Sequence, residues 1–347
     1  MTEAKTLMLQ EALSAPDTVQ DLLEHDAALY AQLGEALRAR PPSGLLTVAR
    51  GSSDHAAHYF AYLVMARLGR LVTSLPMSLI TLYGSRIQGE GLVSLAFSQS
   101  GQSPDLVAPT RQLREHGART LALVNAPGSP LAAAAEFTLP LHAGEERSVA
   151  ATKSYIAQLV AGARLVAQWQ QDETLLQALA ELPQALRRAA ALDWLCAVPA
   201  LRGAERLFVI ARGTGLPVAL EAALKFKETC GIQAEAFSGA EVQHGPMALV
   251  DEGYPLLVFA PRGPAQAGLL QLAEAMRARG AQVLLAAPEG SVDPATPLWL
   301  PLAPTGHEDL DPIAAVQSFY PMVEALARAR GRNPDRPQHL AKVTKTH

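Results

Sequence analysis

An internal repeat constrains the fold of this chain more than any other feature of its sequence. Residues 49–52 match 211–214, and residues 95–97 match 257–259, both pairs 162 positions apart. Two further matches are 121–123 with 283–285, at the same offset, and 139–141 with 300–302, at an offset of 161. Matches that keep their register over such a distance are typical of a duplicated unit. The sequence therefore predicts two copies of one domain.

The repeated stretches have the pattern of buried strands. The apolar runs Leu45–Ala49 and Leu92–Phe97 each lead into a polar turn and then into helical apolar spacing, which in the first case continues to about Leu68. Further strands are expected near 121–125 and 137–141. Strands that alternate with helices predict an α/β domain with a doubly wound parallel sheet.

Helical segments are expected outside these domains. Residues 16–40 favour one or two helices with an N-terminal cap at Asp17–Gln20, and Thr174–Leu201 favours a helical connector with breaks at Pro183 and Pro199. The expected boundaries are an N-terminal helical segment (1–40), a first domain (41–172), a connector (173–202), a second domain (203–331) and a C-terminal tail (332–347).

Composition excludes several classes of protein. The 347 residues are 49% hydrophobic and 18% charged, with a net charge of −4, which gives no basic surface for nucleic acid. Two cysteines do not form a disulfide framework and are typical of a reducing compartment. The N-terminus has no signal-peptide pattern, and no apolar run approaches the roughly 18 residues that a membrane span needs. We expect a soluble cytoplasmic protein.

A serine-rich turn follows the strand Leu92–Phe97. It contains Ser98, Gln99, Ser100 and Ser103 and precedes a helix. Turns at the carboxyl ends of parallel strands are where open α/β sheets bind ligands, and a helix N-terminus favours anions. The turn contains no lysine or arginine, which suits a phosphate ester held by neutral donors. The alternative is an ordinary turn with Ser103 as the helix N-cap.

Two other turns carry small and polar residues. Gly51 permits a tight turn, and Ser52, Ser53 and Asp54 compete for the N-cap position of the next helix. In Glu145–Tyr155, small residues before a helix would let a ligand approach backbone N–H groups. The alternative for this second segment is a capped helix start beside solvated charges.

Charged residues of the second half suggest acid–base chemistry. Glu221, Lys225 and Glu228 fall at i, i+4 and i+7, on one helix face. His244 precedes Gly-Pro, where a helix should stop, and the C-terminal stretch 333–345 is rich in proline. The alternatives are solvated helix charges, a structural histidine and a frayed tail. His55 and His58 lack carboxylate or cysteine support, so no metal site is expected.

Taken together, these motifs resemble the SIS (sugar isomerase) phosphosugar-binding family over Leu45–Thr346. Their order resembles the isomerase half of glucosamine-6-phosphate synthase, whose corresponding segments are the serine loop, Val-Ala-x-Thr-Lys (149–153), Leu-Lys-x-Lys-Glu (224–228), Glu-x-x-His-Gly-Pro (241–246) and Leu-Ala-Lys (340–342). The surrounding sequence is also similar to stand-alone SIS-type glucosamine-6-phosphate deaminases. The resemblance implies two tandem SIS domains, each a flavodoxin-like parallel sheet flanked by helices, with a tail that closes the active site.

The resemblance also implies roles for individual residues. The phosphate would be bound by Ser98, Gln99, Ser100 and Ser103, and the sugar by Ser53 and by the backbone of Val149 and Ala341. Glu228 would move a proton between C1 and C2, Lys342 would lie near the carbonyl carbon or ring oxygen, and His244 would open the ring. Supporting residues would be Ser52, Glu221 and Lys225. In the family the histidine comes from the neighbouring subunit, which implies a homodimer, and no cofactor is required.

The expected reaction is deamination of glucosamine-6-phosphate to fructose-6-phosphate. The synthase's glutaminase domain has no counterpart in this sequence, so we expect the hydrolytic direction rather than glutamine-dependent synthesis. One alternative is another SIS enzyme, either an aldose–ketose isomerase or one acting on galactosamine-6-phosphate or a fructosyl-amino-acid phosphate. A second alternative is a non-catalytic sugar-phosphate sensor. The residues leave the sugar's stereochemistry open.

Overall fold

The computed structural model describes residues 5–342, which form two compact units. Unit I contains residues 17–146, residues 153–180 and the described C-terminal residues from Ala341. Unit II contains residues 5–16, 147–152 and 181–340. The two units interleave along the sequence, whereas the expected domains were continuous segments.

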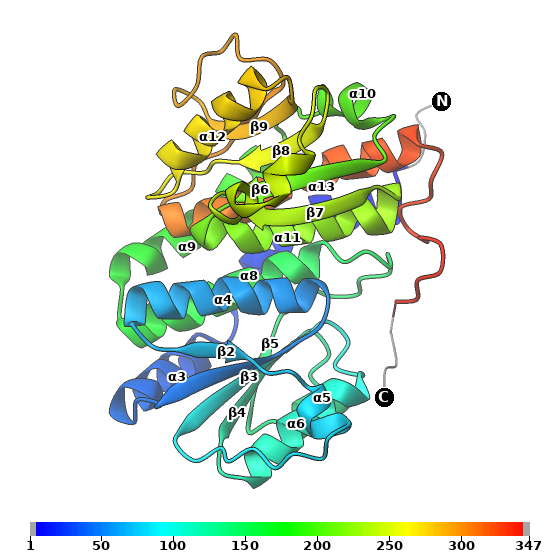
Figure 1. Ribbon diagram of the computed structural model, residues 1–347. Helices are drawn as coiled ribbons and strands as arrows, with labels where there is room; N and C mark the ends of the chain where they lie inside the picture. The colour runs from blue at the N-terminus through cyan, green and yellow to red at the C-terminus, as the bar shows by residue number, and fades with distance from the viewer. Residues whose placement is uncertain (1–4, 343–347) are drawn as a thin grey trace. The chain divides into compact units, whose positions relative to one another are not determined.

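Unit I is built on a five-stranded parallel sheet (Figure 1). Its strands are β1 (Gly44–Val48), β2 (Val72–Ser74), β3 (Leu92–Ser98), β4 (Arg119–Val124) and β5 (Phe137–Pro140). The strand order is β2-β1-β3-β4-β5, with Val48 of β1 opposite Ala96 of β3. The sheet reverses its winding between β1 and β3, and such a switch point places the turns after these two strands side by side.

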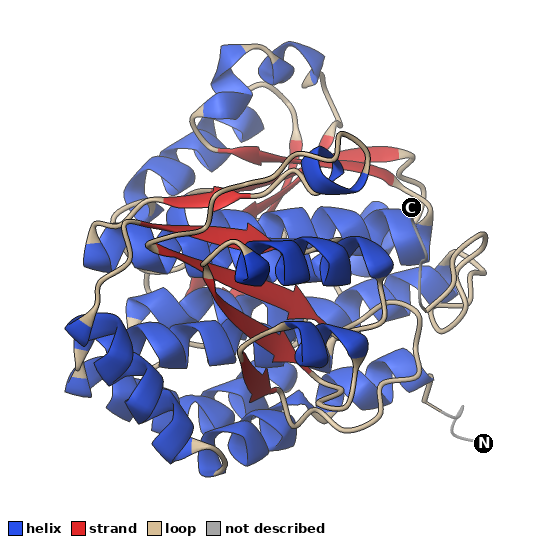
Figure 2. Cartoon of the chain, turned by 90° about the horizontal axis from the view of Figure 1, so that it is seen from below, coloured by secondary structure: helices blue, strands red, loops and turns tan. Residues whose placement is uncertain are grey.

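Helices cover both faces of this sheet, as the α/β pattern predicts (Figure 2). Those of unit I are α2 (Ala15–Glu24), α3 (Ala27–Ala39), α4 (Ser52–Leu68), α5 (Ser78–Thr81), α6 (Pro104–Glu115), α7 (Pro130–Ala134) and α8 (Lys153–Gln170), and α9 (Glu173–Ala190) follows them. Alternate residues of β3 serve the two faces, because Phe97 packs on Phe60 of α4 while Ala96 joins the core with Leu106 of α6.

Unit II contains a second parallel sheet with the same winding. Its strands are β6 (Arg206–Ala211), β7 (Gln233–Ser238), β8 (Pro255–Phe259), β9 (Gln282–Pro288) and β10 (Trp299–Leu302). The order β7-β6-β8-β9-β10 repeats that of unit I, and strands β6, β8 and β9 begin about 162 residues after β1, β3 and β4. The sequence repeat is therefore confirmed as two copies of one parallel-sheet architecture.

Unit II also has helices on both faces of its sheet. They are α1 (Leu7–Leu13), α10 (Ala197–Leu201), α11 (Leu216–Lys225), α12 (Gln266–Ala278) and α13 (Asp311–Ala329), with the short turns η1 (Gly213–Gly215), η2 (Phe226–Cys230), η3 (Glu241–His244), η4 (Pro246–Leu249) and η5 (Glu308–Leu310). On one face, α12 forms a core with β6, β8 and β9. On the other, Phe319 of α13 packs edge-on against Phe226 and Phe259.

Three local expectations were wrong. Asp17 lies in the first turn of α2, which begins at Ala15, so the cap expected at Asp17–Gln20 is not a cap. Gly51, and none of the three residues after it, occupies the N-cap position of α4. Pro183 lies inside α9, which buries apolar residues before and after it, and Pro199 lies inside α10. A proline removes one helical hydrogen bond, but a buried apolar face can sustain the helix through it.

Among residues 5–342, none of the helices combines the length and the apolar character required to cross a membrane.

Candidate active site

The serine-rich turn lies at the carboxyl end of β3, directly before α6. The Gly101 N–H donates to the Ser98 Oγ at 3.0 Å, and the Gln102 N–H donates to the Ser100 Oγ at 3.3 Å. Ser98 is buried, whereas Gln99 and Ser100 are half-buried. Two serine hydroxyls therefore shape the loop from within, at a helix N-terminus where the backbone dipole favours an anion.

Gly101 permits this loop to close. Its φ of +63° is in the left-handed region, and its carbonyl accepts a hydrogen bond from the Leu131 N–H at 3.1 Å. A Cβ at this position would lie 2.1 Å from the Ser129 Oγ and 2.9 Å from Val124 Cγ2. A residue with a side chain does not fit here without displacing its neighbours.

An arginine from the adjacent turn reaches the base of the serine loop. Arg50, which follows β1, pairs with Asp105 in the first turn of α6, with Nε and Oδ2 3.0 Å apart. Asp105 is buried, while the Arg50 side chain is 57% exposed. In the first turn of α4, which follows Arg50, the Ser53 Oγ accepts a hydrogen bond from Gln158 Nε2 at 3.0 Å. The sequence prediction placed no cation in the loop and missed that the switch point brings one beside it.

Lys342 is bound by a buried carboxylate of unit I. Its Nζ lies 3.2 Å from Glu146 Oε2. Glu146 also accepts hydrogen bonds from the Ser154 N–H at 3.1 Å and the Ser154 hydroxyl at 2.6 Å. Glu146 thus caps the start of α8 and holds the C-terminal lysine, so it is not part of a solvated charge run. Ala341, beside Lys342, is exposed.

Three of the charged residues in α11 and the turn after it form one ion-paired cluster in unit II. Lys225 Nζ lies 3.1 Å from Glu221 Oε1 and 2.7 Å from Glu228 Oε2. Glu221 and Lys225 are fully buried, and the Glu228 side chain is 21% exposed. Burial alone would lower the pKa of Lys225, but the two carboxylates outweigh it and raise that pKa above its usual value.

A π-helical turn sets the position of Glu228. The α-helix α11 ends at Lys225, and residues 226–230 continue as η2, a π-helical turn of the type often found at functional sites. Glu228 lies in this turn and reaches Lys225 at i+3. The arrangement provides a carboxylate that is held by an ammonium on one side and reaches solvent on the other, as a proton-transferring base requires.

His244 makes no contact with this cluster through a hydrogen bond or ion pair. It ends η3 and is exposed, and its side chain makes no hydrogen bond or ion pair with any other described residue. Val149 donates its N–H to the Asp335 carbonyl at 3.2 Å, so its own carbonyl is the backbone group left for a ligand. The Asp335 carboxylate accepts from the Leu7 and Met8 N–H groups at 2.9 and 2.8 Å, which binds the C-terminal stretch to the start of α1.

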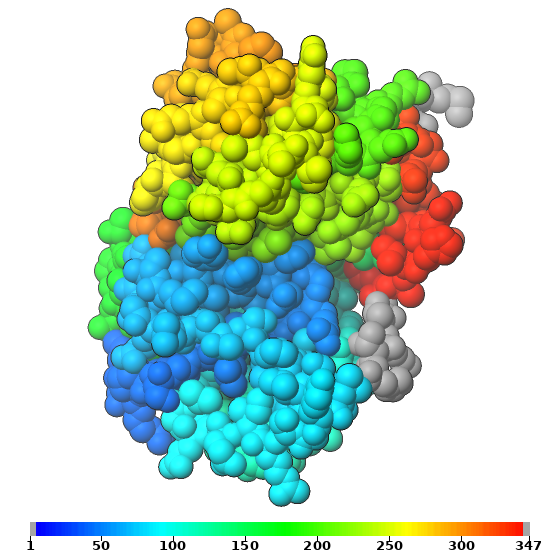
Figure 3. Space-filling model, in the orientation of Figure 1, coloured from blue at the N-terminus to red at the C-terminus, as the bar shows by residue number. Residues whose placement is uncertain are grey.

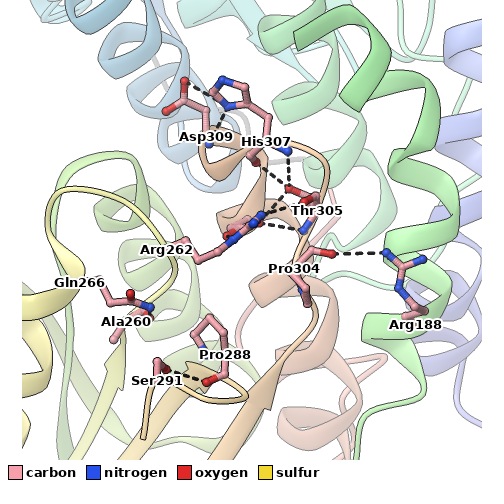
Figure 4. A network of polar contacts seen from close by, with 11 residues as sticks. Arg188, Ala260, Arg262, Gln266, Pro288, Ser291, Pro304, Thr305, His307 and Asp309 are labelled. Atoms are coloured by element: carbon pink, nitrogen blue, oxygen red, sulfur yellow. Dashed lines mark hydrogen bonds and ion pairs between the residues drawn. The ribbon is translucent and has the colours of Figure 1, made fainter. Parts of the chain in front are cut away.

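The edge of the second sheet that corresponds to the serine loop is filled by a polar network (Figure 4). Arg262, which follows β8, pairs with Asp311 at 2.7 and 2.8 Å and donates to the Thr305 carbonyl at 2.7 Å. Thr305 also donates its hydroxyl to the His307 carbonyl. At this edge of the second sheet, the ion pair of Arg262 and Asp311 stands where the first sheet has the neutral donors of the serine loop. The two copies of the domain therefore present different groups to a ligand.

The structure thus groups the expected residues in two sets. Unit I contains the serine loop, Ser52, Ser53, Ala341 and Lys342, and unit II contains Val149, Glu221, Lys225, Glu228 and His244. Sequence reasoning missed Arg50, Glu146 and Asp335 as supports of these groups. Within residues 5–342, no cluster of three or more histidine, cysteine, aspartate or glutamate side chains is arranged to bind a metal ion.

Comparison with known proteins shows the family to which the chain belongs. The SIS domain model matches residues 42–167 and 200–293. Glutamine–fructose-6-phosphate aminotransferase (isomerizing) of Thermus thermophilus is 33% identical over 353 residues, which cover 96% of this chain. The same alignment covers 58% of the aminotransferase, so the chain spans little more than half the length of this curated relative.

Solved structures include similar chains. A candidate phosphosugar isomerase from Silicibacter pomeroyi DSS-3 has a TM-score of 0.89 and 44% identity, covering 95% of this chain and 100% of that one. Glucosamine-6-phosphate deaminase of Thermotoga maritima has a TM-score of 0.79 at 19% identity, covering 98% and 100%, and shows a shared fold. The chain is thus homologous to the isomerase part of the aminotransferase and belongs to the SIS domain family.

Proposed function

We propose that this protein is an enzyme that isomerises a phosphorylated amino sugar and releases ammonia. The substrate that we propose is glucosamine-6-phosphate, and the product is fructose-6-phosphate. The observation that carries the proposal is the Glu221–Lys225–Glu228 cluster, because a partly exposed carboxylate with a buried ion-pair support suits a proton-transferring base. The homology to the aminotransferase, whose name specifies isomerisation of fructose-6-phosphate, supports the sugar class.

The chemistry balances without an external oxidant or reductant. In the open-chain 2-amino aldose, Glu228 removes the proton from C2 while the C1 carbonyl oxygen gains a proton, which gives an enolamine. Glu228 then delivers its proton to C1, and the nitrogen gives up one proton to leave an imine at C2. Water adds to this imine, the C2–N bond breaks, and ammonia leaves with fructose-6-phosphate as the ketone. The ammonium of Lys225 pairs with the Glu228 carboxylate and holds it in one orientation.

We assign phosphate binding to the serine loop. Ser98, Gln99, Ser100 and Ser103 provide neutral donors at the start of α6, and Arg50 adds a positive charge at its base. A phosphate held at a defined place would orient the sugar and reduce the entropic cost of proton transfer. We further assign sugar contacts to Ser53 and to the backbone of Val149 and Ala341.

Lys342 and His244 complete the proposal. We assign Lys342 to the carbonyl end of the open sugar, where its ammonium would stabilise the negative charge of the intermediate. His244 is exposed, which suits a histidine that opens the ring in the active site of a second copy of the chain. The proposed assembly is therefore a homodimer, and mixing His244→Ala with Glu228→Gln chains should partly restore activity if each active site takes its histidine from the other copy.

The direct test is product analysis with purified protein. Glucosamine-6-phosphate should yield ammonia and fructose-6-phosphate in equal amounts, whereas glucosamine without phosphate should react far more slowly. Galactosamine-6-phosphate, run in parallel, reports on the configuration at C4. Absence of both products, with the sugar phosphate still bound, would contradict the deaminase proposal and favour a sensor or a different amine.

A further inference from the structure

A pocket of about 420 Å³ in unit II lies beside the Glu228 cluster. Glu228 and Thr229 line one side, and the stretch after α13, from Arg330 to Gln338, lines the other. This stretch, red in Figure 3, lies on the surface. The volume falls in the range of small-molecule sites, which is about 300–1,000 Å³. The pocket is therefore large enough for a metabolite or for a large substituent of one.

Three arginines line this pocket, and they differ in whether their guanidinium groups are hydrogen-bonded within the fold. Arg330 donates to the carbonyls of Cys230, Arg202 and Ala204 at 2.9, 2.6 and 2.8 Å, so its guanidinium serves the fold. Arg332 and Arg336 are exposed, and their guanidinium groups make no hydrogen bond or ion pair with any residue from 5 to 342. These two groups retain their full capacity to bind a ligand.

Arg332 occupies a defined place next to Glu228. A Cβ on Gly231, which ends the π-helical turn, would lie 2.2 Å from the Arg332 Cζ. The guanidinium therefore lies against the backbone of Gly231, and a glycine is needed there both for this contact and for a φ of +61°. The same turn presents Glu228, so the base and the arginine are positioned by one short segment.

The charge of the pocket favours an anion. Among its described lining residues, Glu228 alone is acidic, and its carboxylate already pairs with Lys225. The nearby carboxylate of Asp335 is occupied by the N–H groups of Leu7 and Met8. Neither carboxylate neutralises Arg332 or Arg336. Guanidinium groups bind carboxylates and phosphates with two parallel hydrogen bonds, which gives strength and geometric selectivity.

We infer that this pocket binds a second anionic group, a carboxylate or phosphate, through Arg332 and Arg336. The inference rests on the proposed function, because that function makes Glu228 the base. It adds a ligand group to the same site. Because Glu228 would act at the carbon that carries nitrogen, an anion beside it is either part of a substituent on that nitrogen or a separate small anion. The first source makes the pocket a determinant of amine specificity, and the second makes it an effector site.

Binding is tested by calorimetric titration with inorganic phosphate at low ionic strength. The wild-type chain should show two sites, one in the serine loop and one in the pocket. Ser98→Ala/Ser100→Ala should remove the first and leave the second. In that background, Arg332→Gln/Arg336→Gln should weaken the remaining site by about tenfold or more for each arginine. Phosphate affinity that survives all four substitutions would overturn the inference.

Arg279→Gln is the matched control, because Arg279 is also exposed in unit II and does not line this pocket. It should leave both sites unchanged. Failure of the proposed function is recognised separately, because it appears as lack of turnover while phosphate binding by the pocket persists.

The two sources of the anion are distinguished by substrate specificity. Two substrates are compared, an N-carboxymethyl amino sugar phosphate and the unsubstituted amino sugar phosphate. The ratio of their kcat/KM values is measured in wild type and in Arg332→Gln/Arg336→Gln. A ratio that falls at least tenfold in the variant assigns the pocket to the substituent. An unchanged ratio, with the pocket's phosphate binding lost, assigns it to a separate anion.

Discussion

Replacement of Gly101 by alanine should destabilise the chain and disrupt the serine loop. The added Cβ would lie 2.1 Å from the Ser129 Oγ, 2.6 Å from the Ser129 Cβ and 2.9 Å from Val124 Cγ2. A left-handed backbone costs a non-glycine residue about 1–2 kcal/mol. Forcing volume into a packed site costs about 1–3 kcal/mol. The sum predicts a loss of about 2–5 kcal/mol in the free energy of unfolding.

Urea unfolding followed by far-UV circular dichroism measures this loss. Gly128→Ala is the matched control, because Gly128 lies nearby and its added Cβ would meet no atom within 4 Å. Combining Gly101→Ala with Ser129→Ala should restore part of the stability, because it removes the oxygen that the new methyl group approaches. A loss below about 1 kcal/mol, or one equal to that of Gly128→Ala, would refute the reasoning.

Three further substitutions test the supports of the site. Lys225→Met should lower the free energy of unfolding by about 3–5 kcal/mol because it leaves the buried Glu221 and the partly buried Glu228 carboxylates without their cation. Since the pKa of Lys225 is raised in the folded state, this loss, measured by urea unfolding, should persist as the pH rises to about 10 and diminish only in stronger alkali. A loss that already diminishes as the pH rises from about 7 to 9 would contradict this account. Glu146→Gln should lower the free energy of unfolding by about 1–3 kcal/mol because a neutral amide replaces the carboxylate that binds Ser154 and Lys342. The midpoint of thermal unfolding should fall, and an unchanged midpoint would refute the supporting role of Glu146. Asp335→Ala should lower the free energy of unfolding by about 1–2 kcal/mol because it removes the acceptor of the Leu7 and Met8 N–H groups in the first turn of α1. It should also speed proteolysis before residue 16, whereas a wild-type cleavage rate would argue against this role.

The sheet architecture followed from the sequence because buried parallel strands are short apolar runs that end at turn residues. Two copies at a spacing of 162 made the assignment stronger than either copy alone, and the observed strands β1, β3, β4 and β5 fall where they were expected. Strand β2, with three partly exposed residues, carries no such run and was not predicted. Helix starts were less predictable, because several polar residues compete for each cap.

The candidate site was partly predictable for the same kind of reason. Helical spacing alone placed Glu221 and Lys225 on one face, because residues four apart are neighbours on any α-helix. That spacing contains no signal for the π-helical turn that carries Glu228, nor for the burial that converts the surface charges into a cluster. Residue spacing predicted which side chains share one helix face, whereas tertiary packing determined that they are buried and ion-paired.

The supports from distant residues were beyond local patterns. Lys342 and its partner Glu146 are 196 positions apart, and Asp335 is 327 positions from the Met8 N–H that it accepts. No periodicity or motif connects residues at such separations, because the fold alone brings them together. Arg50 could have been found by combining two predictions, since the strands before Arg50 and before the serine loop are neighbours at a switch point.

The most direct test of the account compares wild type with Glu228→Gln, using glucosamine-6-phosphate and measuring both ammonia release and calorimetric binding. The amide keeps the shape of the carboxylate but does not accept the proton, so turnover should fall at least about a hundredfold while sugar phosphate affinity changes little. Ammonia release at the wild-type rate by Glu228→Gln would contradict the assignment of Glu228 as the base.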